Sequence, residues 1–199
     1  MERPRANEKR ENEKVIERLA DVLDSLSIRY AIGGSVASAL YGTVRFTRDA
    51  DINVEPFSPV ADRLYQLLQD EFYISREAME EALKSHGSFN VIHFETAFKI
   101  DLFVSRPREF ERRLLERRHL LRLSDESSRD VSVVSPEDII LLKLDWFRQT
   151  GCTSERQWND VLGVLAVQGD ALDFDYLTDS ARELGLEELF NRARAEAET

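Results

Sequence analysis

Hydrophobic and polar residues follow two different patterns along the chain, and the change falls near residue 135. Apolar residues recur at helical spacing from Val15 to Leu26, which predicts an amphipathic helix. Between residues 29 and 134 the pattern is that of short strands and helices, and the runs at residues 50–54 and 98–104 alternate with a period of two, as in half-buried strands. Predicted strands cover residues 29–32, 50–54, 89–94, 98–104, 120–123 and 131–134, the last two as edge strands. Predicted helices cover residues 36–41, 60–71, 76–85 and a basic segment opened by Pro107.

The remainder of the chain is helical in pattern. Ser135-Pro136-Glu137 predicts a helix start, because serine caps a helix, proline fits its first position and acids favour its first turn. Helices are predicted over about residues 136–148, 155–167, 175–184 and 187–197. The predicted fold class is therefore α/β (α+β), a small mixed sheet with flanking helices followed by a C-terminal helical bundle. The predicted domains are residues 1–134, with an N-terminal helix, and residues 135–199.

Three aspartates occupy matching positions in two of the predicted strands. Asp49 and Asp51 lie two residues apart and so project from one face, and Asp101 is opposite in phase to the apolar residues around it. If these strands are neighbours, three carboxylates meet, and their repulsion calls for a cation. Oxygen ligands with no His or Cys nearby in sequence favour Mg²⁺ or Mn²⁺ over zinc. The acid pair alone also fits an ordinary exposed strand.

A glycine turn precedes the acids. Gly33-Gly34-Ser35 follows a predicted strand and opens a predicted helix. Glycines allow the backbone to approach a phosphate closely, and a helix N-terminus offers N–H donors to an anion. The turn alone also fits an ordinary strand-to-helix connection. The order of glycine turn, acid pair and third acid is more specific than any one of them.

This order resembles the nucleotidyltransferase superfamily that includes DNA polymerase beta. It is most similar to a small bacterial branch that contains abortive-infection toxins. Residues 33–42 (GGSVASALYG) resemble the first motif of that branch, and residues 45–52 (RFTRDADI) resemble the second. In the helical half, residues 136–144 (PEDIILLKL) resemble a helix that carries a lysine, and residues 156–160 (RQWND) resemble an Arg-Asp-x-x-Asp element.

The resemblance implies roles for particular residues. Asp49 and Asp51 would bind the metals that bridge the triphosphate, and Asp101 would hold the second metal and help deprotonate the attacking hydroxyl. The other predicted nucleotide-binding residues are Gly33, Gly34, Ser35, Arg45, Thr47, Arg48, Lys143 and Asp160.

Lys143 is a cation within an apolar stretch. We expect it at the border of the apolar stripe, with its ammonium reaching the triphosphate. Asp160 is an alternative partner for a buried lysine. A third possibility is a stem that packs on the core while the charged head stays in water.

The implied activity is metal-dependent transfer of a nucleoside monophosphate from an NTP, such as ATP, to a hydroxyl acceptor with release of pyrophosphate. The implied cofactor is Mg²⁺ or Mn²⁺. The acceptor stays open among a small molecule, a protein hydroxyl and an RNA end. Two other hypotheses stay open as well. The protein could be a non-catalytic nucleotide-binding or partner-binding module, or a toxin paired with an antitoxin.

Composition narrows these alternatives. The 199 residues, 42% of them hydrophobic, can form a core, and the net charge of −11 disfavours a polyanionic partner such as nucleic acid. Small-molecule or protein acceptors are therefore preferred. The single cysteine, Cys152, cannot form an intrachain disulfide, and no apolar run reaches the roughly 20 residues that span a bilayer. We expect a cytoplasmic protein without a membrane partner.

Overall fold

A computed structural model describes residues 3–197, whose contacts form two compact units. The first unit contains the chain up to Ile32 together with Phe46–Val133, and the second contains Gly33–Arg45 together with the chain from Val134 onward. The predicted domain division after residue 134 stays a prediction. The contacts add that Gly33–Arg45, which carries the glycine turn, groups with the C-terminal helices.

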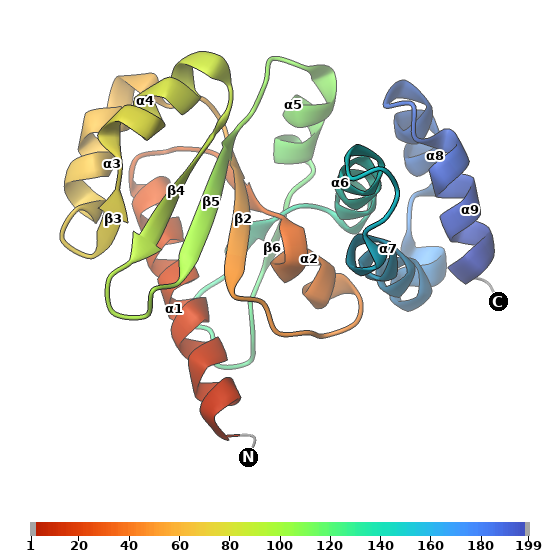
Figure 1. The fold of residues 1–199 in the computed structure, drawn as a ribbon, viewed down its shortest axis with the longest axis horizontal. Coiled ribbons are helices and arrows are strands. Elements are labelled where there is room, and N and C mark those ends of the chain that lie inside the picture. The colour runs from red at the N-terminus through yellow and green to blue at the C-terminus, as the bar shows by residue number, and fades with distance from the viewer. Residues whose placement is uncertain (1–2, 198–199) are drawn as a thin grey trace. The chain divides into compact units, whose positions relative to one another are not determined.

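The first unit is built on a mixed sheet of seven strands with the order β3-β4-β5-β2-β1-β7-β6 (Figure 1). The strands are β1 (Tyr30–Ile32), β2 (Asp49–Val54), β3 (Phe72–Ile74), β4 (Ser88–His93), β5 (Lys99–Val104), β6 (His119–Leu121) and β7 (Val131–Val133). The β2–β5 and β1–β7 pairs are parallel, and the other pairs are antiparallel. The sheet is therefore mixed, as predicted.

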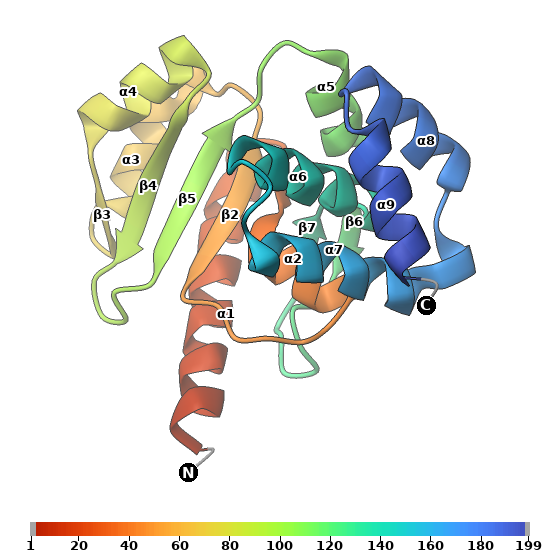
Figure 2. The ribbon, with the colours of Figure 1, turned by 45° about the vertical axis from the view of Figure 1, so that its right-hand side comes forward.

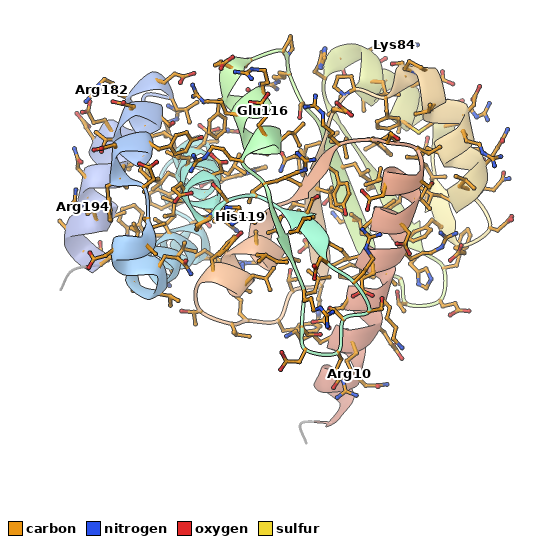
Figure 3. All side chains as sticks on the ribbon, turned by 180° about the vertical axis from the view of Figure 1, so that it is seen from behind. Arg10, Lys84, Glu116, His119, Arg182 and Arg194 are labelled. Carbon is orange, nitrogen blue, oxygen red and sulfur yellow. The ribbon has the colours of Figure 1, made fainter. Side chains whose placement is uncertain are left out.

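The helices of the first unit are α1 (Arg3–Ser25), α3 (Ala61–Leu68), α4 (Arg76–Ser85) and α5 (Glu109–Glu116), with a 3-10 turn at Ser58–Val60. Helix α1 lies across one face of the sheet, as the front and rear views show (Figures 1 and 3). Its apolar stripe is fully buried at Leu19, Ala20 and Leu23. This stripe is the one predicted from helical spacing, and the helix extends from it toward the N-terminus as far as Arg3.

Two short strands differ from the prediction. Strand β3 was not predicted, because it has only three residues and directly follows the helix predicted over residues 60–71, which in the structure ends at Leu68. Strand β7 was predicted as an edge strand, and this is wrong, because it pairs with both β1 and β6. A three-residue strand is too short for its period to show how many neighbours it has.

The second unit is helical. It contains α2 (Gly34–Tyr41), α6 (Pro136–Gln149), α7 (Glu155–Gln168), α8 (Phe174–Glu183) and α9 (Glu187–Ala197), with a 3-10 turn at Gly169–Ala171 (Figure 2). Ser135 caps α6, since its Oγ accepts a hydrogen bond from the Asp138 N–H at 3.1 Å. Helix α7 packs against α2, α6 and α9.

A close backbone approach joins α2 to α7. A Cβ atom added at Gly42, where α2 ends, would lie 2.8 Å from the carbonyl carbon of Gly163 and 2.8 Å from the nitrogen of Val164. Both neighbours are backbone atoms and cannot turn aside. Glycine at position 42 therefore permits the contact that holds the segment from Gly33 to Arg45 on α7.

These elements confirm the predicted fold class, a mixed sheet with flanking helices followed by a C-terminal helical bundle. Within residues 3–197, no helix combines the length and the apolar character needed to cross a membrane.

Candidate functional site

The three predicted aspartates share one face of the sheet in the first unit. In the parallel β2–β5 pair, Asp51 lies opposite Asp101 and Asp49 lies opposite Lys99. Buried and half-buried residues alternate along both strands, with the aspartates at the half-buried positions. Residues opposite each other in register point to the same face. The strand phase predicted from the sequence is therefore confirmed, and we call Asp49, Asp51, Lys99 and Asp101 the acid face.

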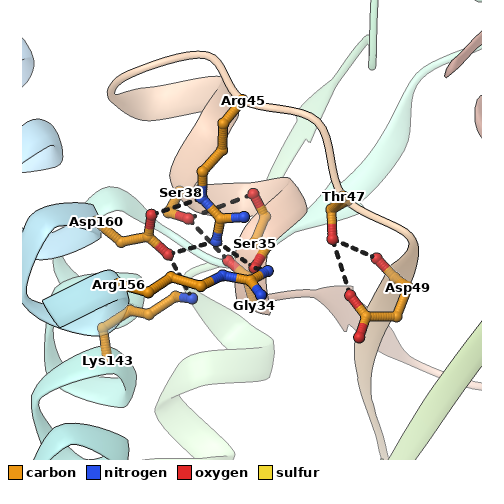
Figure 4. Close-up of polar contacts among 9 residues, drawn as sticks. All are labelled: Gly34, Ser35, Ser38, Arg45, Thr47, Asp49, Lys143, Arg156 and Asp160. Carbon is orange, nitrogen blue, oxygen red and sulfur yellow. Dashed lines mark hydrogen bonds and ion pairs between the residues drawn. The ribbon is translucent and has the colours of Figure 1, made fainter. Parts of the chain in front are cut away.

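Neighbouring side chains hold Asp49 and Asp101. The Thr47 hydroxyl donates a hydrogen bond to Asp49 Oδ1 at 2.8 Å, as Figure 4 shows. The Lys99 ammonium binds Asp101 Oδ2 at 2.6 Å. The hydrogen bond to Asp101 raises the pKa of Lys99, and the charges of Asp101, Asp49 and Asp51 raise it further, against a smaller lowering by burial. One ammonium thus feels the field of all three carboxylates.

The donor set fits a hard divalent cation. Three carboxylates stand on one face of two neighbouring strands, and their combined field already acts on a single cation, Lys99. Among residues 3–197, no three His, Cys, Asp or Glu side chains lie close enough together to enclose a metal ion as they stand. The hydrogen bonds from Thr47 and Lys99 explain why the acids do not enclose a metal ion, because each bond holds a carboxylate oxygen at its own donor. The metal-binding role of the aspartates stays a prediction.

The glycine turn lies in the second unit, at the start of α2. Gly33 is the N-cap residue, and Gly34 has a φ of 54°. Residues with a side chain are strained in this left-handed backbone conformation. The conformation therefore explains why position 34 is a glycine. The first N–H groups of any helix have no partner within the helix and can bind an anion.

A cluster of charged side chains surrounds the buried hydroxyl of Ser35 in the same unit (Figure 4). Arg45 binds Asp160 through two hydrogen bonds, Nε to Oδ1 at 2.8 Å and Nη2 to Oδ2 at 2.7 Å. Lys143 Nζ binds the same Oδ2 at 2.8 Å. Arg156 Nη2 donates to Ser35 Oγ at 2.9 Å, and Arg45 Nη2 donates to it as well. We call these five residues the Asp160 cluster.

The Asp160 cluster has an excess of positive charge. The cluster contains one carboxylate, Asp160, and three cations, Arg45, Lys143 and Arg156, so its formal net charge is +2. Burial opposes ionisation of Asp160, but the hydrogen bonds from Arg45 and Lys143 outweigh it and lower the pKa of this carboxyl below its usual range. Asp160 is therefore ionised at neutral pH.

The Lys143 side chain is buried, with 5% exposed, and its ammonium binds a carboxylate of the same unit instead of reaching water. Of the alternatives drawn from the sequence, the structure shows the ion pair with Asp160. Because the Arg45 side chain is 25% exposed, the arginine is the more accessible partner of Asp160. Binding of a triphosphate by Lys143 stays a prediction.

Arg156 was not among the predicted binding residues. A signal was present in the sequence, since Arg156 precedes Asp160 by four residues and such residues share one face of a helix. Arg48, which was predicted to bind nucleotide, is exposed in the loop before β2. Its predicted role is untested.

Comparisons with known proteins concern the fold. No protein-family model matches the chain, and no curated protein matches it. Among solved structures, the chain is similar to an antigenic nucleotidyltransferase-like protein from Paracoccidioides brasiliensis, with 18% identity, 92% of each chain covered and a TM-score of 0.53. It is also similar to the antibiotic-resistance factor ANT(2'')-Ia, with 12% identity, 90% of this chain and 97% of that chain covered, and a TM-score of 0.55. These likenesses concern the fold, and a fold of this kind is what the resemblance found in the sequence implies.

Proposed function

We propose that the protein is a nucleotidyltransferase that moves a nucleoside monophosphate from an NTP to a hydroxyl-bearing acceptor and releases pyrophosphate. The observation that carries this proposal is the pairing of Asp51 with Asp101 in the β2–β5 register, with Asp49 on the same face. The fold shared with a nucleotidyltransferase-like protein supports it.

The acid face has the chemistry for a divalent metal. Asp49, Asp51 and Asp101 would hold Mg²⁺ or Mn²⁺, which would supply charge stabilisation at the phosphates and a lowered pKa at the attacking hydroxyl. The resemblance implies that Asp101 also helps to deprotonate the attacking hydroxyl, and for this role its Oδ2 would have to be released from the Lys99 ammonium that it binds at 2.6 Å. Thr47 would hold the Asp49 carboxylate in a fixed orientation.

The Asp160 cluster has the chemistry for phosphate. Ser35 and the N–H groups at the start of α2 offer donors, and Arg45 and Arg156 already direct guanidinium groups at Ser35 Oγ. In this role Asp160 and Lys143 would position Arg45. The binding of phosphate by Gly33, Gly34 and Ser35 belongs to this part of the proposal.

The preferred acceptor is a small molecule or a protein hydroxyl. The net charge of −11 disfavours close approach of a nucleic-acid backbone. One protein of similar fold is an antibiotic-resistance factor, which gives a reason to include hydroxyl-bearing antibiotics among the acceptors tested.

The test is transfer of label from each of the four NTPs, labelled at the α-phosphate, with Mg²⁺ or Mn²⁺ and a panel of acceptors. The panel contains aminoglycosides and other hydroxyl-bearing small molecules, protein fractions of a cell extract, and RNA. We expect one acceptor to acquire the label with wild-type protein and none with Asp51→Asn.

Other outcomes separate the competing readings. Tight NTP binding without label transfer to any acceptor would favour the non-catalytic nucleotide-binding module. Labelling of RNA alone would overturn the preference for a small-molecule or protein acceptor. Label transfer that is equally strong in Asp51→Asn would remove the acid face from the proposal.

A further inference from the structure

Lys99 is the one member of the acid face that carries a positive charge, and nothing in the proposed reaction uses it. Its Cα lies opposite that of Asp49 in the β2–β5 register, and its ammonium binds Asp101 Oδ2 at 2.6 Å. It therefore contacts one proposed metal ligand and lies opposite a second. The side chain is 41% exposed, and that of Asp101 is 22% exposed, so the pair stands at the surface of the sheet and water or ions can reach it.

We propose that Lys99 is a built-in cation that neutralises the acid face and competes with divalent metal for its carboxylates. This inference rests on the proposed metal-binding role of Asp49, Asp51 and Asp101. Three carboxylates on one face repel one another, and the Lys99 ammonium offsets that repulsion in the metal-free protein. A metal ion that binds Asp101 through Oδ2 must displace the ammonium, and one that binds through the other oxygen lies beside a positive charge.

The competition has a structural basis beyond charge. A lysine ammonium on a flexible four-carbon stem can swing away from Asp101 without any movement of the backbone. Such a release leaves the β2–β5 register unchanged, so the three acids keep their shared face. Lys99 thus sets the metal concentration at which a metal ion replaces the ammonium on the carboxylates.

The experiment measures the affinity of the metal-free protein for Mn²⁺ by calorimetry, with no nucleotide present. We expect Lys99→Met to bind Mn²⁺ about tenfold more tightly than wild type, because a positive charge beside the metal is removed. Lys99→Arg keeps the charge and should bind as wild type does. Lys84→Met is the matched control, since Lys84 is an exposed lysine on α4 of the same unit and its loss changes the net charge equally (Figure 3).

A second readout is the melting temperature. Metal-free Lys99→Met should melt below wild type, and saturating Mn²⁺ should raise its melting temperature more than that of wild type or Lys84→Met. If Lys99→Met fails to fold, Lys99→Gln serves as the neutral variant in both measurements, because its amide can still donate to Asp101.

Two outcomes would overturn the inference in different ways. Mn²⁺ affinity that is the same in the neutral variant and in Lys84→Met would show that Lys99 does not compete, while the metal-binding role of the acids would stand. Mn²⁺ affinity that does not fall in Asp51→Asn would show that the acids do not bind metal, and the proposed function would fail with the inference.

Discussion

The acid face of the first unit and the Asp160 cluster of the second unit differ in how deeply their charged side chains are buried and in how far away in the sequence their partners lie. The acids are half-buried on two strands, and the hydrogen bonds that Thr47 donates to Asp49 and Lys99 to Asp101 come from two residues away in the sequence. In the Asp160 cluster, Arg45 and Asp160 are 115 residues apart, and Lys143 and Asp160 are 5% and 8% exposed. The contacts of the acid face are thus local in sequence and lie on a sheet that its own backbone pairing holds together. The contacts of the Asp160 cluster join distant segments and are part of the packed interior of the second unit.

This difference predicts that the two regions respond differently to substitution. Removing one acid leaves the backbone pairing of β2 and β5 in place and lowers like-charge repulsion. Removing Arg45, Lys143 or Asp160 takes a partner from a buried charge, which is costly in a medium of low dielectric constant.

The largest expected effect is on the stability of the second unit. Asp160→Ala removes the buried carboxylate shared by Lys143 and Arg45. We expect the free energy of unfolding to fall by about 3–5 kcal/mol, as is typical when one partner of a buried ion pair is deleted. Urea denaturation of the full chain measures it. Asp179→Ala is the control in the same unit, because the Asp179 side chain is 80% exposed and its loss should have little effect. Equal losses in both variants would contradict the structural role of the cluster.

A second expected effect separates activity from stability in the first unit. Asp51→Asn should reduce label transfer at least about 100-fold, an effect of about 3 kcal/mol on the barrier, because a proposed metal ligand is lost. The melting temperature should stay the same or rise slightly, since repulsion with Asp101 is relieved.

Asp62→Asn is the control for this variant, because Asp62 is 77% exposed in the same unit and has no part in the proposed reaction. A loss of folding in Asp51→Asn that Asp62→Asn does not share would show that the acid face is structural. The contrast with the Asp160 cluster would then disappear.

A third expected effect separates the residues of the Asp160 cluster that bind phosphate from those that position the phosphate-binding residues. Arg156→Gln should weaken ATP binding in the presence of Mg²⁺ about tenfold, because a charged donor beside Ser35 is lost. Arg182→Gln is the control, since the Arg182 side chain is 59% exposed on α8 of the same unit. Calorimetry on both variants measures the difference. Unchanged affinity in Arg156→Gln would mean that this arginine only orients the Ser35 hydroxyl.

The same contrast explains what the sequence could and could not predict. The acid face followed from a period of two in the residues around Asp51 and Asp101, because a strand exposes alternate side chains whatever its neighbours are. The helix start at Ser135 followed in the same way from local capping chemistry. Both depend on residues close together in the chain.

The Asp160 cluster depends on distant residues, and there the sequence predicted less. Asp160 was one possible partner of Lys143, but the burial of the pair results from how α6 packs against α7. Arg156 meets Ser35 across 121 positions of sequence, so its spacing from Asp160 alone could not assign it to the cluster. The pairing of Lys99 with Asp101 is local, yet the alternation that revealed the acids says nothing about which cation neutralises them.

The smallest expected effect is a dependence of stability on acid pH, and its sign follows from Asp160. The hydrogen bonds from Arg45 and Lys143 lower the pKa of Asp160 in the folded protein, whereas in the unfolded chain it lies near the usual value of about 3.9. The unfolded chain therefore takes up the proton first as the pH falls. The stability that Asp160 contributes is complete above the unfolded pKa and is lost as the pH falls through the folded pKa.

Asp160→Asn cannot titrate, so its free energy of unfolding should fall less steeply below about pH 4 than that of wild type or of Asp179→Asn. Equal slopes for wild type and Asp160→Asn would mean that the buried carboxylate does not depend on its cations for its charge, and the distinction between the packed cluster and the open acid face would lose its electrostatic basis.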